Sequence, residues 1–256
     1  MCEEVSGEIH EELSEQACEK DNEEIKVNPD KKLLIDYKGE TYQRIPVKTH
    51  IVTDEDKIAD VIVKYTTPVL QDGDIIFISE KIVACTQHRA IKLVDIKPRK
   101  LAVFLSKHVV KTNYGIGLAM PETMEMAIQE CGTIRILFAA AVSFITKLFG
   151  KKGWFYRIAG EGARAIDGPC ECTIPPYNEY VVLGPLKPEK VAKEISDAVN
   201  GHPVCIVDAN DIACMALGCS HIEQYPKEFF ENVLSDNPLG QDNEQTPVGI
   251  IRKINA

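Results

Sequence analysis

Hydrophobic positions recur along this chain in two rhythms that alternate from one segment to the next. Short apolar runs bounded by turn residues predict strands, and apolar positions three and four residues apart predict helices. Strands are predicted at 31–52 (two strands with a turn at Gly39), 74–79, 154–158, 180–183, 204–207 and 248–251. Helices are predicted at 53–65, 98–110, 121–150 (one or two helices), 188–199 and 226–234. This alternation predicts an α/β fold, with α+β as the other possibility.

Two of the predicted helices carry recognisable starts. Thr53 is followed by three acidic residues, a pattern typical of a helix cap and first turn, and Pro188 suits a first turn because its missing N–H needs no partner there. Their inward faces are the apolar stripes Ile58, Val61, Ile62 and Tyr65, and Val191, Ala192, Ile195 and Val199. Both helices are therefore expected to pack against a sheet.

The longest apolar run, 136–145, lies between Arg135 and Lys147. It is too short to span a bilayer, so no membrane partner is expected. Because the run is apolar all round, we expect a helix buried between layers or in a subunit interface.

Charge divides the chain into two parts. The net charge is −10, but residues 1–30 hold 11 acids and 2 lysines (−9), which leaves 28 acids and 27 bases (−1) in 31–256. We expect a disordered acidic tail over 1–30 and a folded domain over 31–256. The nearly neutral body argues against a nucleic-acid partner. The acidic start lacks a signal peptide, and nine scattered cysteines suit a reducing compartment, so a cytoplasmic protein is expected.

Two aspartates each end an apolar run and are the first candidates for chemistry. Asp167 follows Ala165-Ile166, and Asp208 follows the predicted strand 204–207. A carboxylate at the end of a buried strand costs desolvation unless a cation compensates it, and two such groups could hold a hard divalent ion. The alternative is that both residues merely cap helices or form turns.

Four segments, taken in order, resemble the coenzyme F-420-0:γ-glutamyl ligases, which attach glutamate to a deazaflavin cofactor. They are 45–49 with 70–89, which includes Lys81 and Arg89; 165–167 with 180–185; 204–208; and 237–252, which contains Asn237-Pro238-Leu239-Gly240-Gln241. The resemblance implies two intertwined mixed-sheet units, a homodimer, and a groove for nucleotide and metal.

A ligase of this kind would use GTP or ATP to convert a carboxylate into an acyl phosphate, which an amine such as that of glutamate then attacks. Such a reaction needs a divalent ion, Mg²⁺ or Mn²⁺, and cations for the phosphates. Asp167 and Asp208 would hold the metal, with Glu244 or Gln241 completing its ligands, and Lys81 would contact phosphate. The predicted loop at Gly160 and Gly162, beside Arg164, could offer backbone N–H groups to an anion. The small-molecule acceptor and the catalytic residues are not assigned.

The chain also departs from the family pattern. Ala209-Asn210-Asp211 follows Asp208, where the family has Thr and then Gly-Arg, and a helical insertion is expected at about 116–155. Asn210 and Asp211 could be groups behind the metal ligands, or could cap a helix over 212–217. The alternatives are therefore a non-catalytic nucleotide- or metabolite-binding protein, or a metal protein whose ligands are cysteines. Its four thiols would be Cys170, Cys172, Cys214 and Cys219, although their spacing is unlike that of zinc ribbons.

Overall fold

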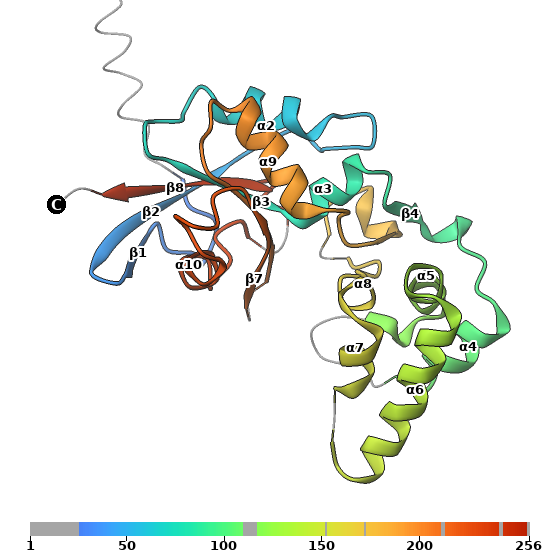
Figure 1. The fold of residues 1–256 in the computed structure, drawn as a ribbon. Helices are drawn as coiled ribbons and strands as arrows, with labels where there is room; N and C mark the ends of the chain where they lie inside the picture. Colours follow the sequence, from blue (N-terminus) through green and yellow to red (C-terminus); the bar gives the residue numbers. More distant parts are fainter. Residues whose placement is uncertain are drawn as a thin grey trace, which may run out of the picture.

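The computed structural model describes residues 26–109, 117–151, 153–171, 173–210, 213–240 and 243–254. A six-stranded mixed sheet with helices on both faces forms one end of the molecule, and a lobe of helices forms the other (Figure 1). A second sheet of two strands lies between them. The predicted α/β class is confirmed.

The large sheet has the strand order β1-β2-β8-β3-β6-β7. The strands are β1 (Leu34–Tyr37), β2 (Glu40–Val47), β8 (Val248–Ile254), β3 (Ile75–Ser79), β6 (Val204–Ala209) and β7 (Cys214–Cys219). β3 and β6 run parallel, whereas the other neighbouring pairs are antiparallel. β1 and β2 form the predicted hairpin, turning through Lys38 (φ 50°) and Gly39 (φ 82°), the left-handed pair that a tight hairpin turn requires.

The alternation of side chains along the strands builds two cores. Ile76 and Ile78 pack beneath α2 (Ile58–Thr66) and α9 (Pro188–Ala198), whereas Ile75 and Phe77 face α10 (Lys227–Val233). Both predicted stripes turn inward: Val61 and Ile62 of α2 are buried, as are Val191, Ala192, Ile195 and Val199 at α9. Successive strand residues point to opposite faces, so one apolar run supplies both layers.

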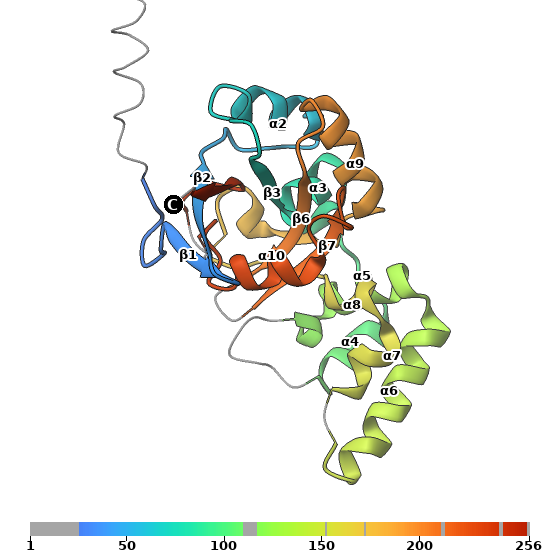
Figure 2. The ribbon, with the colours of Figure 1, turned by 60° about the vertical axis from the view of Figure 1, so that its left-hand side comes forward.

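The helical lobe, seen from a second side in Figure 2, is inserted between β4 (Ala90–Lys92) and β5 (Tyr180–Val182), which pair with each other. A short helix, α3 (Glu80–Thr86), leads from β3 towards β4. The lobe contains α4 (Lys100–Ser106), α5 (Pro121–Cys131), α6 (Thr133–Leu148), α7 (Trp154–Ala159) and α8 (Glu161–Arg164). A third core, which includes Leu118, Met124, Ile128 and Ile136, holds these helices together and reaches Val181 of β5.

Three local predictions are wrong, each because other contacts decide. The segment from Thr53 is a turn in which Asp56 accepts from the backbone N–H of Thr53 (2.7 Å), and the helix begins at Ile58. Residues 154–158, predicted as a strand, form α7, because packing against α6 overrides their β propensity. Residues 214–217 belong to strand β7, which pairs with β6 as a hairpin, and not to a helix.

α6 is not buried between layers, which was one of its two predicted positions; the other, a subunit interface, stays a prediction. Ile136 and Ala139 face the lobe core, but Leu137, Phe138, Phe144 and Ile145 are exposed. No single helix in the described part of the chain is long and apolar enough to cross a membrane; α5 and α6 meet that requirement only as a pair, bent by 116°.

The end of the acidic tail contacts the sheet domain. Asn28 is buried, and its side chain donates to the Pro238 carbonyl (2.9 Å) and to Thr246 Oγ1 (2.8 Å). The part of the expected tail that the structure describes therefore contributes to the fold.

Candidate functional site

The candidate site forms where the two parallel strands end. Ser79 of β3 is in register with Val207 of β6, so the residues that follow, Glu80 and Asp208, lie side by side at the carboxyl ends of neighbouring strands. Parallel α/β units commonly present ligand-binding groups at this edge. Glu80 is also the first residue of α3, and Lys81 follows it.

A third carboxylate, Asp167, arrives from the lobe. Its backbone forms an isolated bridge with Val182 of β5, with N–H···O=C bonds of 2.8 and 2.9 Å in the two directions. Its side chain is 52% exposed and forms an ion pair with Lys81, whose Nζ lies 3.1 Å from Asp167 Oδ2. Two strands and the lobe thus bring Glu80, Asp208 and Asp167 to one ammonium group.

The cluster holds more acidic groups than basic ones. Burial raises the pKa of Glu80 well above its usual range, and the charges of Asp208 and Asp167 raise it further. Burial and the charge of Asp167 likewise raise the pKa of Asp208. Burial would lower the pKa of Lys81, but its contact with Asp167 raises that pKa overall. If all three carboxyl groups ionise, one ammonium does not compensate them, so a further cation would favour their ionised forms.

Glu80 carries the clearest sign of an incomplete site. It is 8% exposed, and its Oε2 has no hydrogen-bond partner among the residues that the structure describes. Buried carboxylate oxygens without partners are costly and call for an explanation such as an ion. The oxygen donors suit Mg²⁺ or Mn²⁺. Across the described ranges, however, no three Asp, Glu, His or Cys side chains are arranged to hold a metal ion as they stand.

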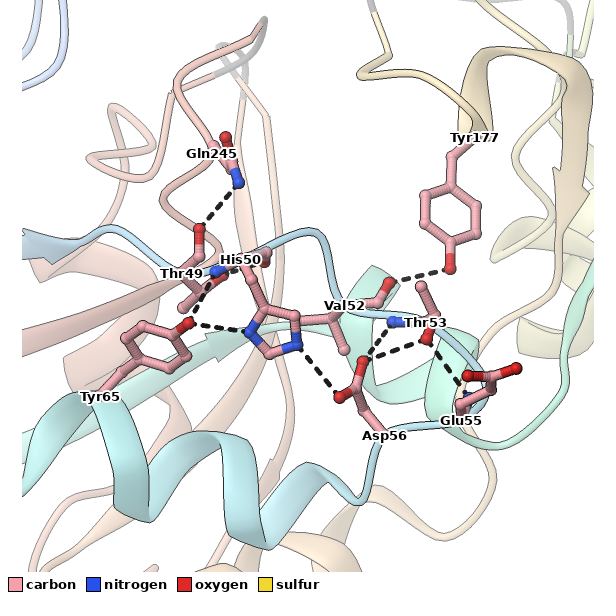
Figure 3. A network of polar contacts seen from close by, with 9 residues as sticks. All are labelled: Thr49, His50, Val52, Thr53, Glu55, Asp56, Tyr65, Tyr177 and Gln245. Atoms are coloured by element: carbon pink, nitrogen blue, oxygen red, sulfur yellow. Dashed lines mark hydrogen bonds and ion pairs between the residues drawn. The ribbon is translucent and has the colours of Figure 1, made fainter.

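A second polar network fixes the loop beside this cluster (Figure 3). The His50 ring bridges the Tyr65 hydroxyl (Nδ1, 2.9 Å) and Asp56 (Nε2, 3.1 Å). Tyr177, from the lobe, donates to the Val52 carbonyl at 2.8 Å. Gln245 donates to the carbonyl of Thr49 at 2.8 Å, which ties the same loop to the segment before β8. The loop is thereby anchored to the sheet domain and to the lobe at once.

A model of the F420-0:gamma-glutamyl ligase family matches residues 46–225, which include Lys81, Asp167 and Asp208. The chain belongs to the F420-0:gamma-glutamyl ligase family. No curated protein matches the chain significantly. The family match indicates that this chain is an enzyme with ligase activity. It also covers the strands and the bridge that assemble the cluster, whereas Gln241 and Glu244 lie beyond it.

The two glycines predicted to offer backbone N–H groups to an anion lie instead against side chains of neighbouring helices. Glu161 opens the four-residue helix α8, so Gly160-Glu161-Gly162 is not a loop. A Cβ on Gly160 would lie 2.7 Å from the Arg135 guanidinium, and one on Gly162 would lie 3.2 Å from Glu130 Cγ. Small residues at both positions let α8 approach α5 and α6. Arg164 is exposed and pairs with Glu161 at 3.2 Å.

Of the two remaining predicted ligands, the structure describes only Glu244. It lies against Gly240, where a Cβ would come within 2.7 Å of Glu244 Oε2, and its role as a ligand stays a prediction. Gln241 lies outside the described residues.

The alternative of a cysteine-ligated metal does not fit the cysteines that the structure describes. Cys214 and Cys219 are buried in β7, where burial raises the pKa of Cys214 to about 12, and Cys170 is disulfide-bonded. Cys172 lies outside the described residues.

Glu80 is the site residue that sequence reasoning missed. It stands next to Lys81, a predicted site residue, so the available signal is a charged pair that follows four consecutive buried residues, Ile75 to Ile78. His50, Asp56 and Tyr177 were missed as well, since their spacing forms no motif and their association depends on the tertiary fold.

Proposed function

We propose that this enzyme is a metal-dependent amide ligase that uses GTP or ATP to activate a carboxylate for attack by glutamate or a similar amine. In that reaction the carboxylate oxygen takes the terminal phosphoryl group and the nucleoside diphosphate leaves. The amine then forms the amide bond and releases phosphate. The observation that carries the proposal is the convergence of Glu80, Asp167 and Asp208 on Lys81 at the ends of two parallel strands.

Asp167 and Asp208 would hold Mg²⁺ or Mn²⁺, and the buried Glu80, whose Oε2 is unpartnered among the described residues, would support it. When bound, such an ion would spread the negative charge of the phosphates. Lys81 would contact a phosphate oxygen through its ammonium, because that group lies 3.1 Å from Asp167 and its side chain is 35% exposed. The partners proposed are a small-molecule acceptor and glutamate, and the enzyme is proposed to act as a homodimer.

The decisive variant is Asp208→Asn, which keeps the size of the side chain and removes one charge. It should weaken binding of Mg²⁺ with nucleotide by more than about tenfold, because a ligand charge is lost. It should also leave the melting temperature of the ligand-free protein unchanged or higher, because carboxylate repulsion is relieved. Asp197→Asn, at an exposed position of α9, is the matched control and should change neither.

Calorimetric titration and thermal melting measure both effects, and glutamate-dependent phosphate release measures catalysis. Binding that is undiminished in Asp208→Asn and in Asp167→Asn would refute the metal assignment. Nucleotide binding without phosphate release, over a range of carboxylate acceptors, would instead favour the non-catalytic binding protein.

A further inference from the structure

The outward face of α6 is the largest run of exposed apolar side chains along any helix in the described part of the chain. Ile134 is 85% exposed, Phe138 60%, Phe144 67% and Leu148 72%, and Leu137 and Ile145 are exposed between them. Together with the exposed Ala141, these positions recur every three or four residues, so they form one stripe opposite Ile136 and Ala139, which face the core. Monomeric proteins rarely leave such a contiguous patch without a partner.

The charged residues on α6 and between α6 and α8 have a single sign. Residues 131–160 contain five bases and no acid, in a chain whose net charge is −10. At about 100° per residue, Arg135 and Lys147 fall on opposite margins of the stripe. Lys151 and Arg157 follow beyond the end of α6, and no carboxylate pairs with these four bases within the described ranges. Arg135 Nε donates to the Ile158 carbonyl at 2.8 Å, so its partner is neutral. An apolar face bordered by cations that lack carboxylate partners complements an apolar layer bordered by anions.

The only tryptophan of the chain lies at the same end. Trp154 begins α7, and the Arg157 guanidinium lies 5.0 Å from the centre of its ring. Tryptophan is enriched at membrane interfaces, where its ring sits at the level of the headgroups. In both overall views α6 runs away from the large sheet, and its C-terminal end, towards which α7 begins, is the part of the lobe farthest from that sheet (Figures 1 and 2).

We propose that this face of α6 binds peripherally to an anionic lipid surface, with the helix lying in the plane of the interface. At 16 residues α6 is about 24 Å long, shorter than the roughly 30 Å apolar core of a bilayer, so it is suited to lie on the membrane. This proposal revises the expectation of no membrane partner, which was based on the length of the apolar run. A second copy of the chain is a poorer occupant, because it would bring five further bases, and no acid, to the contact.

The first test is co-sedimentation of the full chain with vesicles of phosphatidylcholine, alone or mixed with phosphatidylglycerol. The chain should bind the mixed vesicles and bind the neutral ones much more weakly. Phe138→Ser/Phe144→Ser should lower the partition coefficient by at least about tenfold, because two aromatic side chains no longer insert into the lipid. Arg135→Gln/Lys147→Gln should lower it by about an order of magnitude at low salt and by less at high salt. Val94→Ser, at a position that is 83% exposed in the short helix 93–95, is the matched control and should bind like the parent.

Fluorescence of Trp154 provides a second measurement that needs no variant. Brominated phosphatidylcholine in the mixed vesicles should quench it, and unbrominated vesicles should not. Absence of quenching, or equal sedimentation of the parent and the double phenylalanine variant, would overturn the proposal. So would a vesicle-free dimer that Phe138→Ser/Phe144→Ser converts to a monomer in analytical ultracentrifugation, since the face would then bind a second copy.

Discussion

Arg44 is the largest fully buried side chain in the sheet domain, and its partner Asp236 allows a sharp test of the packing. The guanidinium is 0% exposed and donates through both terminal nitrogens to the two carboxylate oxygens of Asp236. It also donates to the backbone carbonyls of Val233 (3.0 Å) and Lys32. This bidentate pair joins β2 to the segment after α10.

Asp236→Asn removes the compensating charge and leaves the buried guanidinium in place. Breaking a buried pair costs about 3–5 kcal/mol, but the Asp236 side chain is 37% exposed and partly screened, so we expect a loss of about 2–3 kcal/mol in the free energy of unfolding. In an Arg44→Met background the same change should cost less than about 0.5 kcal/mol, because no buried charge is left behind. Urea unfolding at neutral pH measures both values.

The pH dependence has a definite sign. Burial alone would raise the pKa of Asp236, but Arg44 holds it below its usual value. The pair therefore stabilises the fold above the unfolded-state pKa of about 4, and this contribution is lost as the pH falls through the lower folded-state value. Glu194→Gln, in the exposed pair with Lys190, is the control and should change stability by less than about 0.5 kcal/mol. Equal losses from Asp236→Asn with and without Arg44 would refute the reasoning.

Two further predictions concern stability and are checked by thermal melting. Deleting residues 1–25 should leave the melting temperature nearly unchanged, whereas deleting 1–30 should lower it measurably, because two buried hydrogen bonds of Asn28 are lost, worth about 1–2 kcal/mol together; equal effects would show that Asn28 contributes nothing. Gly218→Ala should destabilise the fold by more than about 2 kcal/mol, since its Cβ would lie 2.3 Å from the backbone of Pro188 and Glu189, which cannot move without shifting α9; an unchanged melting temperature would mean that α9 is not seated as described.

The parts of the fold that the sequence predicts are those whose pattern is self-contained. The apolar stripe of α9 and the apolar run of β3 each predict burial from their own residues, and both predictions are confirmed. Residues 154–158 mislead because their aromatic content favours a strand until α6 is available to pack against. Glu80 could not be ranked from sequence, because its burial and its charged neighbours arise only when β3 pairs with β6, more than a hundred residues away along the chain.

The pairing of β4 with β5 has a consequence for how the enzyme can be altered. The chain enters the lobe at Lys92 and returns at Tyr180, and these two residues face each other in the same ladder. The lobe is a long insertion between the two strands of a hairpin, and such an insertion can be shortened without disturbing the strands on either side. Asp167 lies within the insertion and is held in place by Val182, which also pairs with Ala90. A truncated enzyme could therefore dispense with α6 and its apolar face, but only if the return path through Asp167 were kept intact.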